Sequence, residues 1–143
     1  VQRIARRTGL AVADAQAVVD AVPLSFAPIA GTVALIEQLH AAGRPLFFLS
    51  NMPAPYADHL DAAHPVLLRF TDGVYSGRVQ SIKPERAIFD LAARRFGVEP
   101  ADLLFFDDVP ANVDAARAAG WQARVFTHPD AAAADLRALG LLG

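Results

Sequence analysis

Apolar positions along the chain return at two spacings, and these spacings predict helices that alternate with short strands. Residues that recur with a helical period predict helices over 11–22, 28–42, 57–69, 84–96, 111–119 and 130–139, the third with a break near Pro65. Short, unbroken apolar runs predict buried strands over 45–49, 103–106 and 121–126, and a short strand or turn over 73–76. This alternation predicts an α/β fold with a parallel sheet.

Glycine and proline mark the ends of the predicted helices. Gly43, Gly97 and Gly120 each directly follow a helical stretch, where a C-terminal glycine cap is common. Pro84 is expected at the first position of its helix, and Glu85 beside it would complement the positive helix end. Ligands of open α/β sheets bind beyond the carboxyl ends of the strands, so candidate chemistry is sought in the residues that follow each strand.

The composition fits one globular domain and excludes several classes of protein. The chain has 143 residues, of which 54% are hydrophobic and 20% charged, a balance typical of a folded domain. The net charge of -2 argues against a nucleic-acid partner, and no apolar run approaches the roughly 20 residues that cross a membrane. The chain has no cysteine, which excludes disulfides and thiol nucleophiles and fits a cytoplasmic location.

Polar side chains follow two of the predicted strands. Ser50 and Asn51 come directly after the first strand, and Asp107 and Asp108 come directly after the strand over 103–106. Lys83 lies between them in the chain, just before the helix at Pro84. Paired carboxylates are ligands suited to Mg²⁺, lysine is a point charge for phosphate, and hydroxyl and amide groups can donate to phosphate oxygens. These types together predict a phosphoryl-transfer site.

Each of these residues also has a purely structural interpretation. Asp107 and Asp108 could cap the helix that begins near Ala111, Ser50 and Asn51 could form a turn, and Lys83 could be a solvated surface charge. The functional interpretation rests on the order and placement of the residues taken together.

In that order, three stretches resemble the second, third and fourth motifs of the haloacid dehalogenase superfamily. They are Leu49-Ser50-Asn51, Ile82-Lys83-Pro84-Glu85, and Phe105-Phe106-Asp107-Asp108-Val109-Pro110-Ala111-Asn112-Val113 followed by Ala116, Ala119 and Gly120. Ser76-Gly77 before Lys83 also follows the family pattern, and the resemblance covers about 28–135. The branch with a small helical cap is most similar. It includes bacterial sugar-phosphate phosphatases and the N-terminal phosphatase domain of mammalian soluble epoxide hydrolase.

The resemblance implies a Rossmann-like core and a Mg²⁺-dependent phosphatase of small phosphorylated metabolites. Ser50 and Asn51 would hold the transferring phosphoryl group. Lys83 would bind that phosphate and offset the charge of a nucleophilic carboxylate.

The same resemblance assigns the acidic pair to the metal. Asp107 and Asp108 would hold Mg²⁺, with Asp108 favoured as the direct ligand, and Asn112 would support the site near the start of its helix. The paired acids favour a phosphatase over a true dehalogenase, which needs no metal.

The first motif of the family, an Asp-x-Asp, is absent from the 143 residues. In the family its first Asp forms the aspartyl-phosphate and its second is the general acid and base. Residues 1–27 resemble the C-terminal part of the helical cap, and residues 28–143 an α/β core without its first central strand. In the family that strand lies between the strands that end here at Ser50 and Asp107. We therefore expect a fragment of a longer protein, or strands re-paired within the chain, by strand exchange or in a homo-oligomer.

Three functions remain open from the sequence. The favoured one is a phosphatase in a form that includes the Asp-x-Asp strand, with this chain alone inactive. The second is a non-catalytic relative that binds phosphate or metal or serves as an interaction module, and the third, disfavoured by the acid pair, is a dehalogenase. An in-frame Asp-x-Asp upstream of Val1 would favour the first over the second. The substrate stays open because the cap largely sets specificity in the family.

Overall fold

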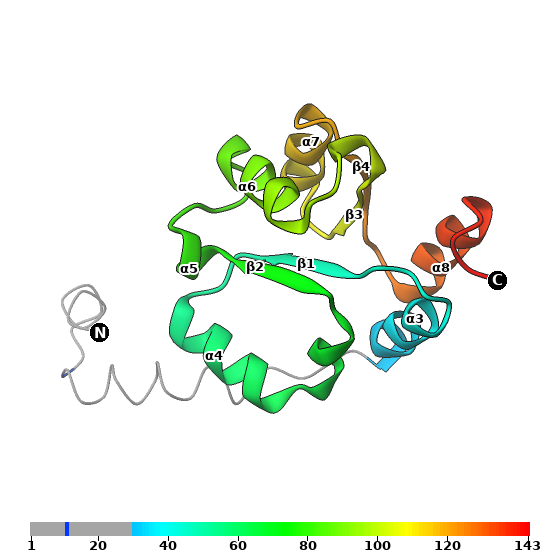
Figure 1. Ribbon diagram of the computed structural model, residues 1–143, viewed down its shortest axis with the longest axis horizontal. Coiled ribbons are helices and arrows are strands. Elements are labelled where there is room, and N and C mark those ends of the chain that lie inside the picture. The colour runs from blue at the N-terminus through cyan, green and yellow to red at the C-terminus, as the bar shows by residue number, and fades with distance from the viewer. Residues whose placement is uncertain (1–10, 12–29) are drawn as a thin grey trace.

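The computed structural model describes residue 11 and residues 30–143 (Figure 1). The predicted cap segment 1–27 and the predicted helix 11–22 therefore lie outside the described residues, apart from residue 11. The described elements, in chain order, are α3 (Ala30–Ala41), β1 (Phe47–Ser50), α4 (Ala54–Ala63), the 3-10 helix η2 (Pro65–Arg69), β2 (Asp72–Tyr75), α5 (Ser76–Val79), α6 (Arg86–Phe96), the 3-10 helix η3 (Pro100–Asp102), β3 (Leu104–Asp107), α7 (Pro110–Ala118), β4 (Gln122–Val125) and α8 (Pro129–Ala138).

The predicted α/β class is confirmed, and each predicted element within residues 30–143 is present with small shifts at its ends. The break predicted near Pro65 separates α4 from η2. The strand or turn predicted over 73–76 is the strand β2, which ends at Tyr75, and the short helix α5 that begins at Ser76 was not predicted.

The predicted start of α6 is wrong. The helix begins at Arg86, and Pro84 lies in the preceding loop after a cis peptide bond with Lys83. The Glu85 carboxylate accepts hydrogen bonds from the Ser81 hydroxyl at 2.8 Å and from the Ile82 amide at 3.2 Å. These two bonds close the loop before α6. Glu85 is the N-cap residue of α6, but its side chain makes no cap hydrogen bond.

The strands form two separate parallel pairs. β1 pairs with β2, with Phe47 opposite Asp72 and Ser50 opposite Tyr75. β3 pairs with β4, with Asp107 opposite Val125. Within residues 30–143 no strand joins the two pairs by hydrogen bonds. The separation falls between β1 and β3, which are the two strands that flank the central strand in the family the sequence resembles.

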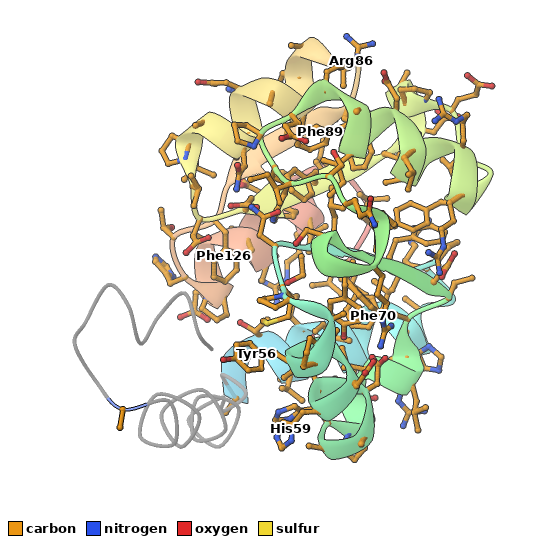
Figure 2. The ribbon with its side chains drawn as sticks, turned by 90° about the vertical axis from the view of Figure 1, so that its left-hand side faces the viewer. Tyr56, His59, Phe70, Arg86, Phe89 and Phe126 are labelled. Carbon is orange, nitrogen blue, oxygen red and sulfur yellow. The ribbon has the colours of Figure 1, made fainter. Side chains whose placement is uncertain are left out.

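Side-chain packing connects the two strand pairs. Ile88 and Phe89 of α6 are fully buried, and they share one core cluster with Leu49 of β1 and Val74 of β2. Figure 2 shows Phe89 directed into this interior, whereas Arg86 of the same helix lies at the surface.

Aromatic rings extend this contact to both pairs. Phe89, Phe105 of β3 and Trp121 meet edge to face with centroids 5.4 to 5.9 Å apart, and Phe47 of β1 stacks on Phe96 at 4.4 Å. Each such pair contributes about 0.5–1.5 kcal/mol beyond the area it buries. The amphipathic helix α6 thus bridges β1 and β3 in the absence of a shared ladder.

A second, smaller cluster lies where α3 meets α8. Leu35 of α3 is buried together with Ala132 and Leu136 of α8, and the two helices lie side by side in Figure 1. In the described part of the chain, no helix has both the length and the apolar character that a membrane span requires.

Candidate active site

The candidate site lies where β1 and β3 end. Ser50 is the last residue of β1, Asp107 is the last residue of β3, and Lys83 belongs to the loop that leads into α6. A continuous set of side-chain contacts connects these three regions, although they are 24 to 32 residues apart in the chain.

Asn51 is joined to the backbone of Lys83 by two hydrogen bonds. The Asn51 side-chain oxygen accepts from the Lys83 amide at 2.8 Å, and its Nδ2 donates to the Lys83 carbonyl at 3.0 Å. Both polar atoms of the Asn51 side chain therefore form hydrogen bonds within the protein. The sequence predicts Asn51 as a phosphate ligand; in the structure its side chain is hydrogen-bonded to the backbone of the loop that carries Lys83.

Lys83 forms a buried ion pair with Asp107. The Lys83 Nζ atom lies 2.5 Å from Asp107 Oδ2, and the two side chains are only 9% and 5% exposed. The ammonium also lies 5.5 Å from the centre of the Phe105 ring, within range of a cation–π contact. The interpretation of Lys83 as a solvated surface charge is therefore wrong.

Asp107 is held by three partners. Its Oδ1 accepts from the Val109 amide at 2.8 Å, and Asn112 Nδ2 donates to both carboxylate oxygens at 3.3 Å. Burial by itself would raise the pKa of this carboxyl group. The hydrogen bonds from Lys83, Val109 and Asn112 together with the Lys83 charge outweigh burial and hold the pKa below its ordinary value. Asp107 is therefore a fixed, charged carboxylate at neutral pH.

Asn112 is buried on the first turn of α7, where it touches Asp107. The position of Asn112 agrees with the supporting role that the resemblance assigns to it. The alternative in which the acid pair caps α7 does not describe this geometry. Val109 is the N-cap residue and has no side-chain cap, and Asp107 accepts from the amide of Val109 itself.

Asp108 differs from Asp107 in its exposure and in its contacts. It is exposed, and within the described residues its carboxylate has no hydrogen bond or ion pair. The Ser50 hydroxyl is likewise without a partner among the described residues. These two groups remain available to a ligand, whereas Asp107, Lys83, Asn51 and Asn112 are bonded to one another.

Ser76 is a residue of the site region whose role the sequence analysis missed. It is buried at the start of α5, and its hydroxyl oxygen accepts from the Met52 amide at 2.9 Å. Its signal in the sequence is a Ser-Gly pair directly after a strand, which is part of the pattern that resembles the family.

The acid pair suits Mg²⁺ in ligand chemistry but supplies only part of a coordination shell. A carboxylate such as that of Asp108 is a hard oxygen ligand that Mg²⁺ prefers. Within residues 30–143, no three His, Asp or Glu side chains gather into a metal-binding cluster. Further oxygen ligands would have to come from water, backbone, substrate or residues outside that range.

Parallel strand pairs with polar groups at the strand ends are typical of Rossmann-like α/β proteins, which bind ligands at that edge. The profile of haloacid dehalogenase-like hydrolases matches residues 3–120, and the chain belongs to this family.

Relatives and solved structures agree with this assignment. Phosphoglycolate phosphatase of Escherichia coli K12 is 34% identical over 82 residues, which are 57% of this chain and 32% of that enzyme. The chain thus spans about a third of the length of the curated relatives it matches. A predicted haloacid dehalogenase-like hydrolase from Porphyromonas gingivalis is 29% identical, with a TM-score of 0.68 over 87% of this chain and 63% of that one.

Two further structures show the same fold. A protein from Corynebacterium glutamicum has 25% identity and a TM-score of 0.68, over 81% of this chain and 88% of that one. A haloacid dehalogenase family enzyme from Bacteroides thetaiotaomicron, solved as a complex with magnesium and inorganic phosphate, has 24% identity and a TM-score of 0.70 over 87% of this chain and 65% of that one.

Proposed function

We propose that the chain forms the larger part of a Mg²⁺-dependent phosphatase of small phosphorylated metabolites. It acts when an Asp-x-Asp strand completes the sheet beside β1 and β3. The observation that supports this most directly is the buried Lys83–Asp107 pair, which holds a cation beside the strand ends where the family binds phosphate.

The contacts of each site residue determine the role that we assign to it. The Ser50 hydroxyl, which has no partner among the described residues, donates to an oxygen of the transferring phosphoryl group. Lys83 supplies positive charge that stabilises the negative charge on phosphate and on the attacking carboxylate. Asn51 and Asn112 orient these groups through the hydrogen bonds to Lys83 and Asp107.

Asp108 is the residue we assign to the metal. Its carboxylate is exposed and has no partner among the described residues, whereas the negative charge of Asp107 is offset by the Lys83 ammonium. When bound, Mg²⁺ supplies charge stabilisation at the phosphoryl oxygens. Asp107 serves mainly to position Lys83 and Asn112.

Two kinds of substrate are candidates. Phosphoglycolate is named for the curated relatives, and sugar phosphates are implied only by the branch that the motifs resemble. Both are small phosphate monoesters, and both belong in the first set of compounds to test.

The experiment compares two proteins in the presence of Mg²⁺. One is this chain, and the other is a version extended upstream to include an Asp-x-Asp strand; both are assayed with an aryl phosphate, phosphoglycolate and a set of sugar phosphates. We expect turnover only from the longer protein, because the Asp-x-Asp motif that supplies the nucleophilic carboxylate in the family is absent from the 143 residues. Equal and substantial turnover by both proteins would show that the nucleophile lies elsewhere.

A second function is the alternative that the sequence leaves open, a non-catalytic relative. The chain would then bind phosphate or metal, or serve as an interaction module, without catalysis. An extended protein that binds inorganic phosphate but releases no product would support this function over the first.

A further inference from the structure

We infer that Ser76 and Gly77 form a positioning unit that sets the geometry of Ser50 and Asn51 by holding the backbone of Met52. The inference rests on the proposed function only for its catalytic consequence, since the contacts themselves are independent of any reaction.

The contacts satisfy both backbone groups of Met52. The Ser76 hydroxyl oxygen accepts from the Met52 amide at 2.9 Å, and the same hydroxyl donates to the Met52 carbonyl over a longer 3.5 Å. The amide of Gly77 donates to that carbonyl at 3.0 Å. Ser76 is only 6% exposed, so water competes poorly for these bonds.

Gly77 allows the close approach that this arrangement needs. A Cβ atom at position 77 would lie 2.4 Å from the backbone nitrogen of Ala54 and 2.8 Å from the carbonyl oxygen of Met52. Both neighbours are backbone atoms, so the clash could be relieved only by moving the loop. Any side chain at this position would therefore push the segment after β1 away from α5.

The held loop is short and carries the site residues. Three residues, Asn51 to Pro53, separate β1 from α4. The side chain of Asn51 is fastened to the backbone of Lys83, and the backbone of Met52 is fastened to Ser76 and Gly77. The loop is thus held by two different segments, with Ser50 next to it at the end of the β1–β2 ladder.

The catalytic consequence follows from geometry. A displacement of about 1 Å in a group that contacts the transition state can lower the rate about 100-fold. Ser76 and Gly77 need not touch the substrate themselves, because they act through Met52 on the direction of the Ser50 hydroxyl and of the Asn51 side chain.

The first arm of the test measures amide hydrogen exchange by NMR in this chain. Ser76→Ala should make the Met52 amide exchange about tenfold faster or more, because that amide loses its acceptor. Thr71→Ala removes an exposed hydroxyl next to the opposite end of β2 and should leave Met52 exchange unchanged. Circular dichroism confirms that both variants are folded. Unchanged Met52 exchange in folded Ser76→Ala overturns the inference whatever the protein catalyses.

The second arm uses the version extended to include an Asp-x-Asp strand, with an aryl phosphate as substrate. Ser76→Ala and Gly77→Ala should each lower kcat about tenfold or more with KM changed less than about threefold, and Thr71→Ala should match the unchanged protein. In the Ser50→Ala background, Ser76→Ala should lower kcat less than it does alone, because the part of its action that passes through Ser50 is already lost and only the part through Asn51 remains. A full additional loss in that background, or an unchanged kcat in Ser76→Ala, overturns the positioning role.

The failure of the proposed function would look different. If the extended protein hydrolyses none of the phosphate esters, the phosphatase assignment falls. The first arm still decides the inference, because hydrogen exchange at the Met52 amide needs neither substrate nor turnover.

Discussion

Lys83 Nζ lies 2.5 Å from Asp107 Oδ2, so one buried ion pair joins the loop before α6 to the end of β3. The pair links two segments that share no strand ladder, and each partner has further fixed contacts, Lys83 through Asn51 and Asp107 through Asn112. A buried pair with such a network holds both charges in one geometry. The pair thus fixes the position of a buried cation, which under the proposed function lies where an anionic ligand binds.

Replacing Lys83 should destabilise the chain because it leaves a buried carboxylate without its partner. Lys83→Met should lower the free energy of unfolding by about 3–5 kcal/mol, measured by urea denaturation. Arg94→Ala, which removes an exposed cation from α6, is the matched control and should change stability by less than about 0.5 kcal/mol. The double variant Lys83→Met/Asp107→Asn should recover part of the loss. A Lys83→Met variant as stable as the control would contradict the buried pair.

The pKa of Asp107 sets a direction for the dependence of stability on pH. This pKa lies below its ordinary value of 3.8, so the charged carboxylate stabilises the fold above that value. The contribution is lost as the pH falls through the folded-state pKa. Between pH 5 and pH 2, Asp107→Asn should therefore lose less stability than the unchanged chain, whereas Asp114→Asn at the exposed surface should follow the unchanged chain. Parallel curves for all three proteins would contradict this role of Asp107.

Much of the fold could be predicted from local pattern. The apolar runs at β1 and β3 and the glycine after α6 are strong local signals, and the elements are present within a few residues of the predicted ends. The start of α6 could not be predicted in the same way. Pro84 fits a first helical turn equally well, and the bonds that hold Glu85 in the loop depend on Ser81 and Ile82.

The site was predictable in its residues but not in its contacts. Ser50, Lys83 and Asp107 could be found because they follow strands or precede a helix in a family order. The side-chain partners of Asn51 and Ser76 depend on a backbone geometry that no spacing reveals, since an asparagine after a strand can face either a ligand or a neighbouring loop. The gap between the two strand pairs could be anticipated, because it falls between β1 and β3, where the resemblance places the missing central strand.

Gly73 should be sensitive to the smallest side chain. A Cβ atom there would lie 2.1 Å from atoms of the Phe48 ring, and that ring is packed against Phe70 and Tyr75. Gly73→Ala should lower the free energy of unfolding by about 1–3 kcal/mol, measured by thermal denaturation. Gly143→Ala, where no atom lies within 4 Å of the added Cβ, is the control and should be neutral. Equal melting temperatures for the two variants would contradict the packing of Phe48 over β2.

Asn51 should affect both stability and activity through its hydrogen bonds to the Lys83 backbone. In Asn51→Ala the backbone amide and carbonyl of Lys83 lose their partners, which we expect to cost about 1–3 kcal/mol of stability. In the version extended to include an Asp-x-Asp strand, kcat with an aryl phosphate should fall about tenfold or more. Asn51→Asp keeps the acceptor but loses the donor, so its stability should lie between that of the unchanged chain and that of Asn51→Ala. If Asn51→Ala lowers substrate affinity alone and leaves stability unchanged, Asn51 is a direct phosphate ligand and its contact with Lys83 is incidental.

Replacing Asp108 should weaken metal binding and leave the stability of the fold nearly unchanged. Its carboxylate is exposed and has no partner among the described residues, so Asp108→Asn should change the free energy of unfolding by less than about 0.5 kcal/mol. In the extended protein the same substitution should raise the Mg²⁺ concentration for half-maximal activity at least about tenfold, and Mn²⁺ binding followed by electron paramagnetic resonance should weaken in parallel. Asp114→Asn, four residues beyond Pro110 on α7, removes another exposed carboxylate and should leave both readouts unchanged. If Asp108→Asn binds Mn²⁺ as tightly as Asp114→Asn, the metal ligand lies elsewhere, and the fixed carboxylate of Asp107 would be the next to test.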